Sequence, residues 1–546
     1  MIRRVFVLIA VCVWPGLLCS EIRELTPVGF ADEVREVKIA PDQQHVAFLT
    51  SGGGGEALWW APIDGNSDPV LLSGASTNLT EFAIAPGSDR VAFTAFDSGL
   101  LELWVSQVAA PNPVRVSTPS ENGRAESPAF DADGGRVLYR EGPNGGVRRL
   151  WSAPADGNGS AVPISGEHDN CGRFEMAAGG QKVIFHVFQP AFGRSELFVA
   201  PTDGSTAAEV LSLFPGDPED PNDEELTAIT DWMLTPDRSA VIYIAQREWP
   251  DDPDNLAVDL ELYQVAAVGP SGSELRLDLH EPETQKEFND RTDSFVLSPD
   301  GATVVFRYSR SAELPDDRVV DSLFAVPLNR STEPVEVATV SDNVFSFTAT
   351  GGHAVYLGGD TAIADSLRSA PFDGGGFVTL DGDPVSPRMI GDGFIATPDG
   401  VGVVYPVGAE RALWASAADG AGGPVELTPW LGFNGDVQPD FEVTPGSSSV
   451  LYRSDLELSS TYELYASALT GGATVKINDP AMTGRHVFAF EITADEGCVV
   501  FASESSSSAP RRLFAADLHG SCAPSASIFA DGFESGDVSR WSAATL

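Results

Sequence analysis

Two nearly identical stretches of sequence decide the fold: FVLSPDGATVVF at residues 295–306 and FIATPDGVGVVY at residues 394–405. In each stretch an apolar segment opens on phenylalanine, a Pro-Asp-Gly turn follows, and a second apolar segment ends on an aromatic residue. Proline and glycine supply the backbone angles of a tight reversal, so each stretch predicts a β-hairpin.

The hairpin recurs along the whole chain. Ten short apolar strands end on an aromatic residue, and valine stands two positions earlier in every case but Ala354. These aromatic residues are Phe48, Phe93, Tyr139, Phe185, Tyr243, Phe306, Tyr356, Tyr405, Tyr452 and Phe501. A third strand built on leucine and a short fourth strand follow in the repeat. Four antiparallel strands every 45 to 63 residues predict an all-β protein, a β-propeller of about ten blades.

The two ends of the repeat region suggest how the ring closes. The last unit has strands near 490–494, 498–503 and 511–517, and HGSCAPS stands where its fourth strand is expected. Near the N-terminus, EIRELTP matches the fourth-strand segment PVELTP at 424–429. We therefore expect Ile22 to Thr26 to complete the last blade, because this closure covers an exposed sheet edge. Ten blades exceed the usual four to eight, so two smaller rings are the alternative.

The combination of SPDG, a strand ending in an aromatic residue, Leu-Trp and Asp-Gly resembles the TolB-like, WD40-like propeller repeat of exported bacterial proteins. The resemblance covers residues 34 to about 520. It implies a propeller and leaves the function open, because such blades serve scaffolds, binding proteins and peptidase gates alike. The Tol-system protein has an α/β domain before its propeller, whereas here we expect the first blade almost directly after the predicted signal peptide, so the partners of that system are not carried over.

The N-terminus and the C-terminus predict the destination of the protein. Residues 1–20 combine two arginines, an apolar run and a Cys-Ser exit, as in a signal peptide, and no later stretch has the length of a membrane helix. The propeller is then expected at 21–520 and a flexible tail at 521–546. That tail resembles a short segment at the ends of other exported bacterial proteins, and either a sorting tag or a disordered remnant fits it. We expect a bacterial protein in the periplasm, at the cell envelope or in the medium.

The net charge limits the classes of binding partner, and the cysteine content limits the number of disulfide bonds. The formal net charge of −46 argues against nucleic acid as a partner. Three cysteines remain after residue 20, namely Cys171, Cys498 and Cys522. An oxidising compartment permits one disulfide, and Cys498 with Cys522 is the pair closest in sequence, so we predict this bond, with three thiols as the alternative.

Extra chain length around units five and six marks the candidate binding site. The surplus lies in four loops at 214–228, 247–259, 281–293 and 311–321, which we expect on one face of the ring. The predicted ligand-binding residues are Asp220, Asp223, Trp249, Asp251, Asp252, Asp254 and Arg318. A calcium ion is a second interpretation, because hard cations take several carboxylate oxygens. Its ligands would be Asp217, Asp220, Asp223, Asp251 and Asp254, and solvated loops are the simplest alternative.

Catalytic motifs give no support for an enzyme. The sequence has no Gly-x-Ser-x-Gly elbow, no His-Glu-x-x-His and no Gly-x-x-x-x-Gly-Lys phosphate loop, so we name no catalytic residue. The favoured interpretation is a monomeric, non-enzymatic scaffold that binds a protein, peptide or glycan and needs no cofactor, or calcium at most. The alternative is a hydrolase or lyase that uses the central channel, which a cluster of histidines or carboxylates there would favour.

Overall fold

The computed structural model describes residues 22–518 with the exception of several segments. These segments are 28–29, 31, 75–77, 118–122, 167–169, 190–193, 213–225, 249–257, 269–273, 279–290, 312–318, 339–343, 359–365, 382–392, 410, 430–434, 479–484 and 505–508. The predicted signal peptide and tail, residues 1–20 and 521–546, therefore lie outside the described residues.

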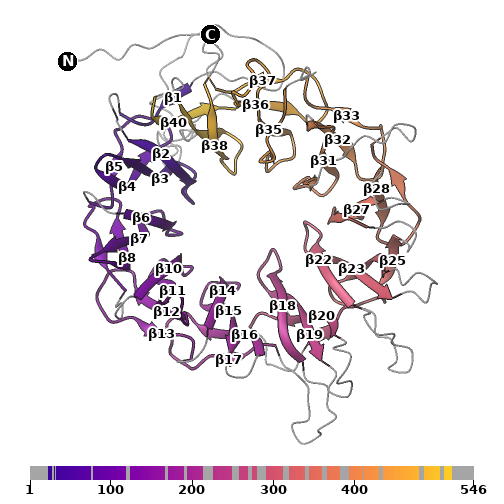
Figure 1. The fold of residues 1–546 in the computed structure, drawn as a ribbon, viewed down its shortest axis with the longest axis horizontal. Helices are drawn as coiled ribbons and strands as arrows, with labels where there is room; N and C mark the ends of the chain where they lie inside the picture. The colour runs from indigo at the N-terminus through magenta and orange to yellow at the C-terminus, as the bar shows by residue number, and fades with distance from the viewer. Residues whose placement is uncertain are drawn as a thin grey trace, which may run out of the picture.

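The described residues form one ring of ten blades around a central channel (Figure 1). Blades 1 to 9 follow the chain from β2 to β37, four strands to a blade, and blade 10 consists of β38, β39, β40 and β1. Blades 2 and 3 share one parallel bridge, Arg124 with Leu101, and so do blades 5 and 6, Leu260 with Arg291. The prediction of a single all-β ring is confirmed, and the alternative of two smaller rings is wrong.

Each blade begins at the channel and ends at the outer edge. The inner strands are β2 (Glu33–Ile39), β6 (Asn78–Ile84), β10 (Gly123–Phe130), β14 (Asn170–Met176), β18 (Leu226–Leu234), β22 (Arg291–Leu297), β26 (Ser346–Ala349), β30 (Ile395–Ala396), β34 (Glu442–Val443) and β38 (Val487–Ile492). The second strands are β3 (His45–Gly52), β7 (Arg90–Asp97), β11 (Arg136–Pro143), β15 (Lys182–Gln189), β19 (Ala240–Glu248), β23 (Thr303–Ser311), β27 (His353–Gly358), β31 (Gly402–Val407), β35 (Ser449–Ser454) and β39 (Cys498–Glu504).

The third and fourth strands complete the blades. The third strands are β4 (Gly55–Pro62), β8 (Leu100–Gln107), β12 (Arg149–Pro154), β16 (Arg194–Pro201), β20 (Val258–Ala266), β24 (Val319–Pro327), β28 (Ser366–Pro371), β32 (Ala412–Ala417), β36 (Glu463–Ala468) and β40 (Arg511–Asp517). The fourth strands are β5 (Val70–Leu71), β9 (Val114–Arg115), β13 (Val162–Pro163), β17 (Glu209–Val210), β21 (Leu275–Arg276), β25 (Val335–Ala338), β29 (Val378–Thr379), β33 (Val425–Glu426), β37 (Val475–Lys476) and β1 (Ile22–Glu24).

The repeated Ser-Pro-Asp-Gly motif makes the turn between the first two strands. In blade 6 the Ser298 hydroxyl donates to Asp300 Oδ1 at 2.6 Å, and the same carboxylate oxygen accepts the Ala302 N–H at 3.0 Å. Gly301 has a φ of 68°, a left-handed conformation that glycine adopts without strain. These bonds lower the pKa of Asp300, with the Ser298 hydroxyl as the main cause. The motif therefore recurs because its side chains fix the reversal.

The aromatic residues that define the repeat form the core between blades. Phe306 in β23 stacks on Phe324 in β24, with ring centroids 5.6 Å apart, and Tyr243 stacks on Tyr263 at 5.7 Å. Such pairs add about 0.5–1.5 kcal/mol beyond the burial of their surface. Tyr243 also belongs to one apolar cluster with Leu197 of blade 4, so the cluster joins neighbouring blades.

The N-terminal strand closes the ring, as predicted. In β1, Ile22 pairs with Ala516 and Glu24 with Phe514, and the Leu25 N–H extends the ladder to Leu513 O at 2.8 Å. Leu25 is buried in a cluster that contains residues of blades 1 and 10. The closure therefore covers both the edge of β40 and an apolar surface.

The inner strands of blades 8 and 9 are shorter than the repeat predicts, with two residues each. In blade 9 Pro439 precedes the aromatic residue Phe441, and proline has no N–H to donate to a sheet ladder. Only an isolated bridge between Val437 and Ser454 remains there outside the named strands. Within the described residues, no helix is long and apolar enough to cross a membrane.

Candidate functional site

The middle parts of the four acidic loops that the sequence singles out fall outside the described residues. Their predicted ends are strand and not loop, because β18, β19, β20, β22, β23 and β24 extend over 226–228, 247–248, 258–259, 291–293, 311 and 319–321. The middle parts contain all of the predicted ligand-binding and calcium-binding residues, Asp217, Asp220, Asp223, Trp249, Asp251, Asp252, Asp254 and Arg318. Their role in binding a ligand or calcium remains a prediction. The described residues point to a different part of the ring.

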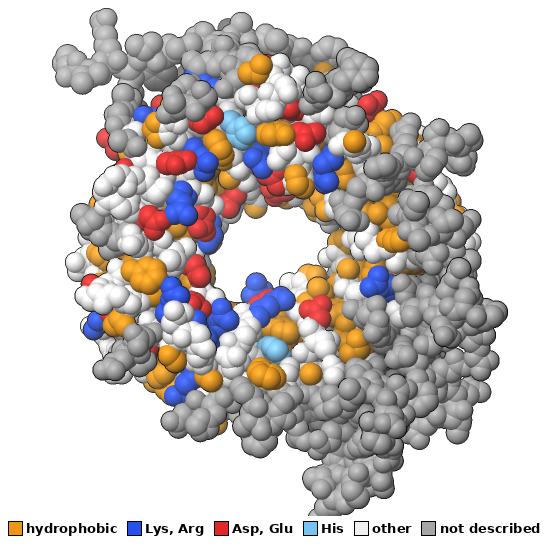
Figure 2. All heavy atoms as spheres, in the orientation of Figure 1, with side chains coloured by type: hydrophobic (Ala, Val, Ile, Leu, Met, Phe, Trp, Pro, Cys, Tyr) orange, Lys and Arg blue, Asp and Glu red, His pale blue; other side chains and the backbone are white. Residues whose placement is uncertain are grey.

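The chain segment of blades 3 and 4 is close to neutral in a protein that is acidic overall. Residues 115–194 contain nine Lys and Arg and nine Asp and Glu, whereas the whole chain carries a net charge of −46. Figure 2 shows Lys and Arg side chains along the channel edge near β10 and β14, and Arg124 and Arg173 belong to these strands.

The inner strands of blades 9, 10 and 1 bring glutamates close together. Burial raises the pKa of Glu491 in β38, and the charges of Glu442 and Glu36 raise it further. The Ile39 N–H donates to Glu491 Oε2 at 2.6 Å and, together with Lys38, opposes this rise. Glu36, Glu442 and Glu491 thus lie near one another where the ring closes, whereas Arg124 and Arg173 lie on the inner strands of blades 3 and 4.

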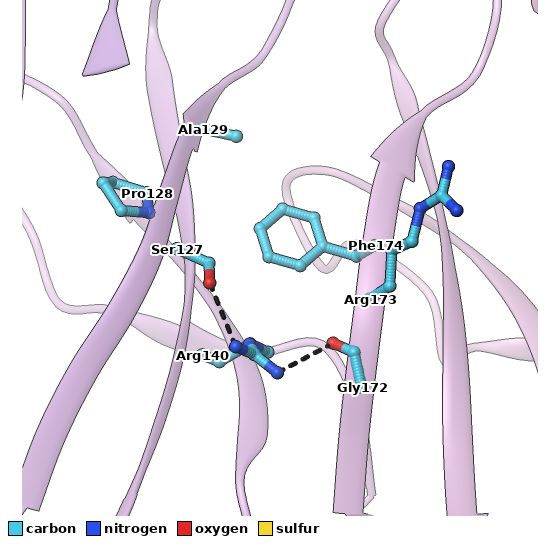
Figure 3. A pocket seen from close by; sticks show the side chains of 7 residues that line it. All are labelled: Ser127, Pro128, Ala129, Arg140, Gly172, Arg173 and Phe174. Atoms are coloured by element: carbon cyan, nitrogen blue, oxygen red, sulfur yellow. Dashed lines mark hydrogen bonds between the residues drawn. The ribbon is translucent and has the colours of Figure 1, made fainter. Parts of the chain in front are cut away.

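A recess of about 420 Å³ opens between blades 3 and 4 (Figure 3). Its lining residues come from β10, β11 and β14, and they are Ser127, Pro128, Ala129, Arg140, Gly172, Arg173 and Phe174. The Phe174 ring points from β14 toward β10, whereas the Arg173 side chain turns to the other side of β14. Arg173 instead donates to Trp232 O of blade 5 at 3.2 Å, so the guanidinium of the recess is that of Arg140.

Arg140 holds the two blades together at the base of the recess. Its Nη2 donates to Ser127 Oγ at 3.0 Å, and its Nη1 donates to Gly172 O at 3.3 Å (Figure 3). Ser127 lies in a β-bulge with a φ of 56°, and its N–H donates to Glu81 Oε2 of blade 2 at 2.7 Å. A chain of hydrogen bonds thus joins blades 2, 3 and 4 and orients the Ser127 hydroxyl.

Arg140 has no carboxylate partner among the described residues, and its buried Nε has no hydrogen-bond acceptor there. Acids on the adjoining segments bind other groups. Glu126 binds Arg148 with both carboxylate oxygens at 3.1 Å, and Glu175 binds Arg173. A half-buried guanidinium without a counter-ion is unusual, because burying a charge is costly unless it is paired.

Arg453 of blade 9 occupies the position equivalent to that of Arg140, and it has the carboxylate partner that Arg140 lacks among the described residues. Its Nη1 donates to Val487 O of blade 10 at 2.9 Å, just as Arg140 bridges to blade 4. Its Nε donates to Asp440 Oδ2 at 2.8 Å, and its Nη2 lies 2.7 Å from the same oxygen. Asp440 and Ser127 each stand 13 residues before their arginine. Blade 9 therefore supplies a carboxylate where blade 3 supplies a hydroxyl.

A neutral histidine lies behind the recess. The Ser195 hydroxyl accepts the Ile229 N–H and donates to Ile229 O, both at 3.1 Å, so His186 Nε2 donates to Ser195 Oγ. Burial lowers the pKa of His186 and favours this neutral form. A Cβ at position 172 would lie 3.3 Å from His186 Nδ1, so Gly172 allows the close approach of this ring to the recess.

The residues of the recess were not predicted from the sequence, although one position of the repeat marks where the recess lies. Eleven residues before the second-strand aromatic, most units have an aromatic residue, such as Phe174 before Phe185 and Phe295 before Phe306. Blade 3 has Pro128 at that position. The smaller side chain and the bulge leave room that an aromatic ring fills elsewhere.

Two further expectations concern metals and cysteines. Within the described residues, no three His, Cys, Asp or Glu side chains come together as a metal-binding group. Cys498 is disulfide-bonded, and Cys522 lies outside the described residues, so its identity as the partner stays a prediction. Cys171 is buried in β14.

Comparisons with known proteins find structural alignments of low TM-score and no match of sequence. No family model and no curated protein sequence matches the chain. Among solved structures, a eukaryotic initiation factor aligns over 85% of this chain and 92% of its own, with a TM-score of 0.46 and 10% identity. TolB from Acinetobacter baumannii aligns over 56% of this chain and 63% of its own, with a TM-score of 0.26 and 14% identity.

Enzymes are also among these structures. Oligogalacturonate lyase from Vibrio parahaemolyticus aligns over 68% of this chain and 95% of its own, with a TM-score of 0.32 and 13% identity. A puromycin hydrolase mutant is 17% identical with a TM-score of 0.32; the alignment covers 68% of this chain and 58% of the hydrolase, less than two thirds of its length. Because each of these TM-scores lies below 0.5, no role of this protein follows from them.

Proposed function

We propose that this protein is an exported, non-enzymatic propeller that binds an extended segment of a peptide or protein at the channel wall of blades 3 and 4. The observation that carries the proposal is the recess of about 420 Å³ beside a guanidinium that has no counter-ion among the described residues. Binding pockets combine an apolar wall with a few oriented polar groups, and Phe174, Ser127 and Arg140 provide both.

The inner strands favour a peptide as the occupant. β10 pairs with β11 on both sides of its bulge, but on its other side it has, among the described residues, one bridge, to Leu101 of β8. An extended segment can hydrogen-bond to such a strand edge while one of its side chains enters a neighbouring pocket. The signal peptide expected at residues 1–20 places this binding in the periplasm, at the cell envelope or outside the cell.

Filling the recess tests the proposal. Ala129 lines the recess, and Ala83 takes the same position in blade 2, so Ala129→Phe and Ala83→Phe form a matched pair. We expect pentapeptides selected on the wild type from a random library to bind Ala129→Phe at least about tenfold more weakly and Ala83→Phe unchanged. Both variants should first show cooperative thermal unfolding.

Three results would contradict the proposal. The library could yield no peptide that binds the wild type, or the selected peptides could bind Ala129→Phe as well as the wild type. Binding of glycans alone, on an array of oligosaccharides, would replace the peptide by a sugar as the occupant.

A further inference from the structure

A bridging arginine directly after the second-strand aromatic residue lies at the blade 3 junction and at the blade 9 junction. Of these two arginines, that of blade 9 has a carboxylate partner, and that of blade 3 has none among the described residues. At the blade 9 junction, Asp440 accepts hydrogen bonds from the Nε and Nη2 atoms of Arg453. At the blade 3 junction, Ser127 accepts from Nη2 of Arg140, and Nε is left without an acceptor among the described residues. The blade 9 junction therefore predicts which group would complete the blade 3 junction. That group is a carboxylate that accepts hydrogen bonds from the guanidinium.

We propose that the recess between blades 3 and 4 binds a carboxylate of the captured segment, an Asp or Glu side chain, at the guanidinium of Arg140. The inference rests on the function proposed above, which concerns where the segment binds. It adds the class of side chain that the recess selects. The ligand would supply from outside the chain the group that Asp440 supplies within it.

The surroundings of Arg140 fit such a side chain. Hydrogen bonds between guanidinium and carboxylate groups are stronger than those between neutral partners, and more so where water is partly excluded. The Ser127 hydroxyl sits on a rotatable bond and can release Nη2 to a stronger acceptor. Pro128 and the Phe174 ring form an apolar wall for the methylene groups of the entering residue.

Two substitutions at one position separate charge from size. Ser127→Asp places a carboxylate at the position that Asp440 occupies in blade 9, and Ser127→Asn has nearly the same shape without the charge. Both residues tolerate the positive φ of 56° at this position better than most others do. The variants are therefore expected to fold, and a thermal unfolding curve for each checks this.

The probes are two acetylated and amidated pentapeptides that differ only in a central glutamate or glutamine. Their flanking residues are taken from a peptide selected on the wild type. We expect the wild type to bind the glutamate peptide at least about tenfold more tightly than the glutamine peptide in calorimetric titration at low salt. Ser127→Asp should abolish that preference, and Ser127→Asn should keep it. The preference should also shrink at high salt.

The outcomes distinguish the two proposals. If both peptides bind the wild type equally and Ala129→Phe still abolishes binding, the recess holds a segment but not its carboxylate, and this inference is overturned alone. If neither peptide binds any variant, the proposed function fails as well. An equal loss of preference in Ser127→Asp and Ser127→Asn would overturn the role of charge. A glutamate preference that only Ser127→Asp removes supports the inference.

Discussion

The closing sector of the ring, blades 9, 10 and 1, differs from the recess sector, blades 3 and 4, in the partner of its bridging arginine. In the closing sector Arg453 has Asp440, Arg512 Nη1 has Glu24 at 3.0 Å, and Arg511 has Glu33 at 2.8 Å. In the recess sector Arg140 has only neutral acceptors among the described residues. The comparison teaches that the same bridging position is completed by a carboxylate within the chain in blade 9 and, among the described residues, by neutral acceptors alone in blade 3.

Removing the closing strand should have the largest effect on this comparison. A chain without Ile22 to Thr26 loses the ladder to β40 and the burial of Leu25, whose exposed fraction is 4%. Truncation of a buried leucine alone costs about 2–5 kcal/mol. We expect the melting temperature to fall by several degrees or more in calorimetry, with Leu25→Ala giving a smaller fall. An unchanged melting curve would contradict the role of β1 in closure.

The disulfide of Cys498 should rank second. If Cys522 is its partner, as the sequence predicts, Cys522→Ser removes a covalent link in the closing sector and lowers stability by about 2–4 kcal/mol. Peptide mapping of the unreduced protein should recover a fragment that joins the two cysteines. Recovery of Cys522 as a thiol would refute the pairing, and Cys171→Ser serves as the control for a cysteine outside it.

Exchanging the residues at the two equivalent positions, 127 and 440, should change the free energy of unfolding in opposite directions, by about 1 kcal/mol or less in each variant. Asp440→Ser leaves Arg453 without its carboxylate and should lower the free energy of unfolding, although Asp440 is 44% exposed and solvent screens the pair. Ser127→Asp should raise it at neutral pH. That gain should vanish as the pH falls below about 4, because the introduced carboxylate then becomes protonated. Chemical denaturation of both variants at two pH values measures these changes in the free energy of unfolding. Two changes of the same sign would show that positions 127 and 440 are not equivalent.

The two sectors should respond alike to mild acid. Burial lowers the pKa of His186 in the recess sector, and burial together with Arg453 and Arg511 lowers the pKa of His486 in the closing sector. Between the folded and unfolded pKa values the unfolded chain binds more protons, so stability is full above the unfolded pKa of about 6.5 and falls as the pH decreases below it. Melting temperatures from pH 8 to pH 5 should fall less steeply in His186→Gln and His486→Gln than in the wild type. Parallel slopes for all three proteins would argue against both histidines.

The long acidic loops of blades 5 and 6 should matter least for stability. We expect shortening of 216–225 and 250–258 to leave the fold intact and to remove any rise in melting temperature caused by calcium, through loss of Asp220, Asp223, Asp251, Asp252 and Asp254. The same variant separates the two candidate sites, since peptide binding at blades 3 and 4 should persist. Loss of peptide binding on shortening would move the site to these loops.

Local chemistry in the sequence determined the repeat, the class of fold and the closure. Serine, proline, aspartate and glycine in Ser298 to Gly301 fix a turn through their own side chains and backbone angles, and valine and aromatic residues at a period of two fix the strands. The match of Ile22 to Thr26 with a fourth strand identified β1 for the same reason. Where local signals were weak, as before Phe441 with Pro439, the predicted inner strand proved shorter.

Only the tertiary structure decided where the recess lies and which arginine it exposes. Ser127, Arg140 and Gly172 belong to three strands of two blades, and no residue of this set is distinctive by itself. Their meaning comes from distances across a blade junction and from the contrast with Arg453 and Asp440 of blade 9. Whether a charge has a partner depends on packing between segments far apart in the chain, and a repeat pattern in the sequence does not contain that information.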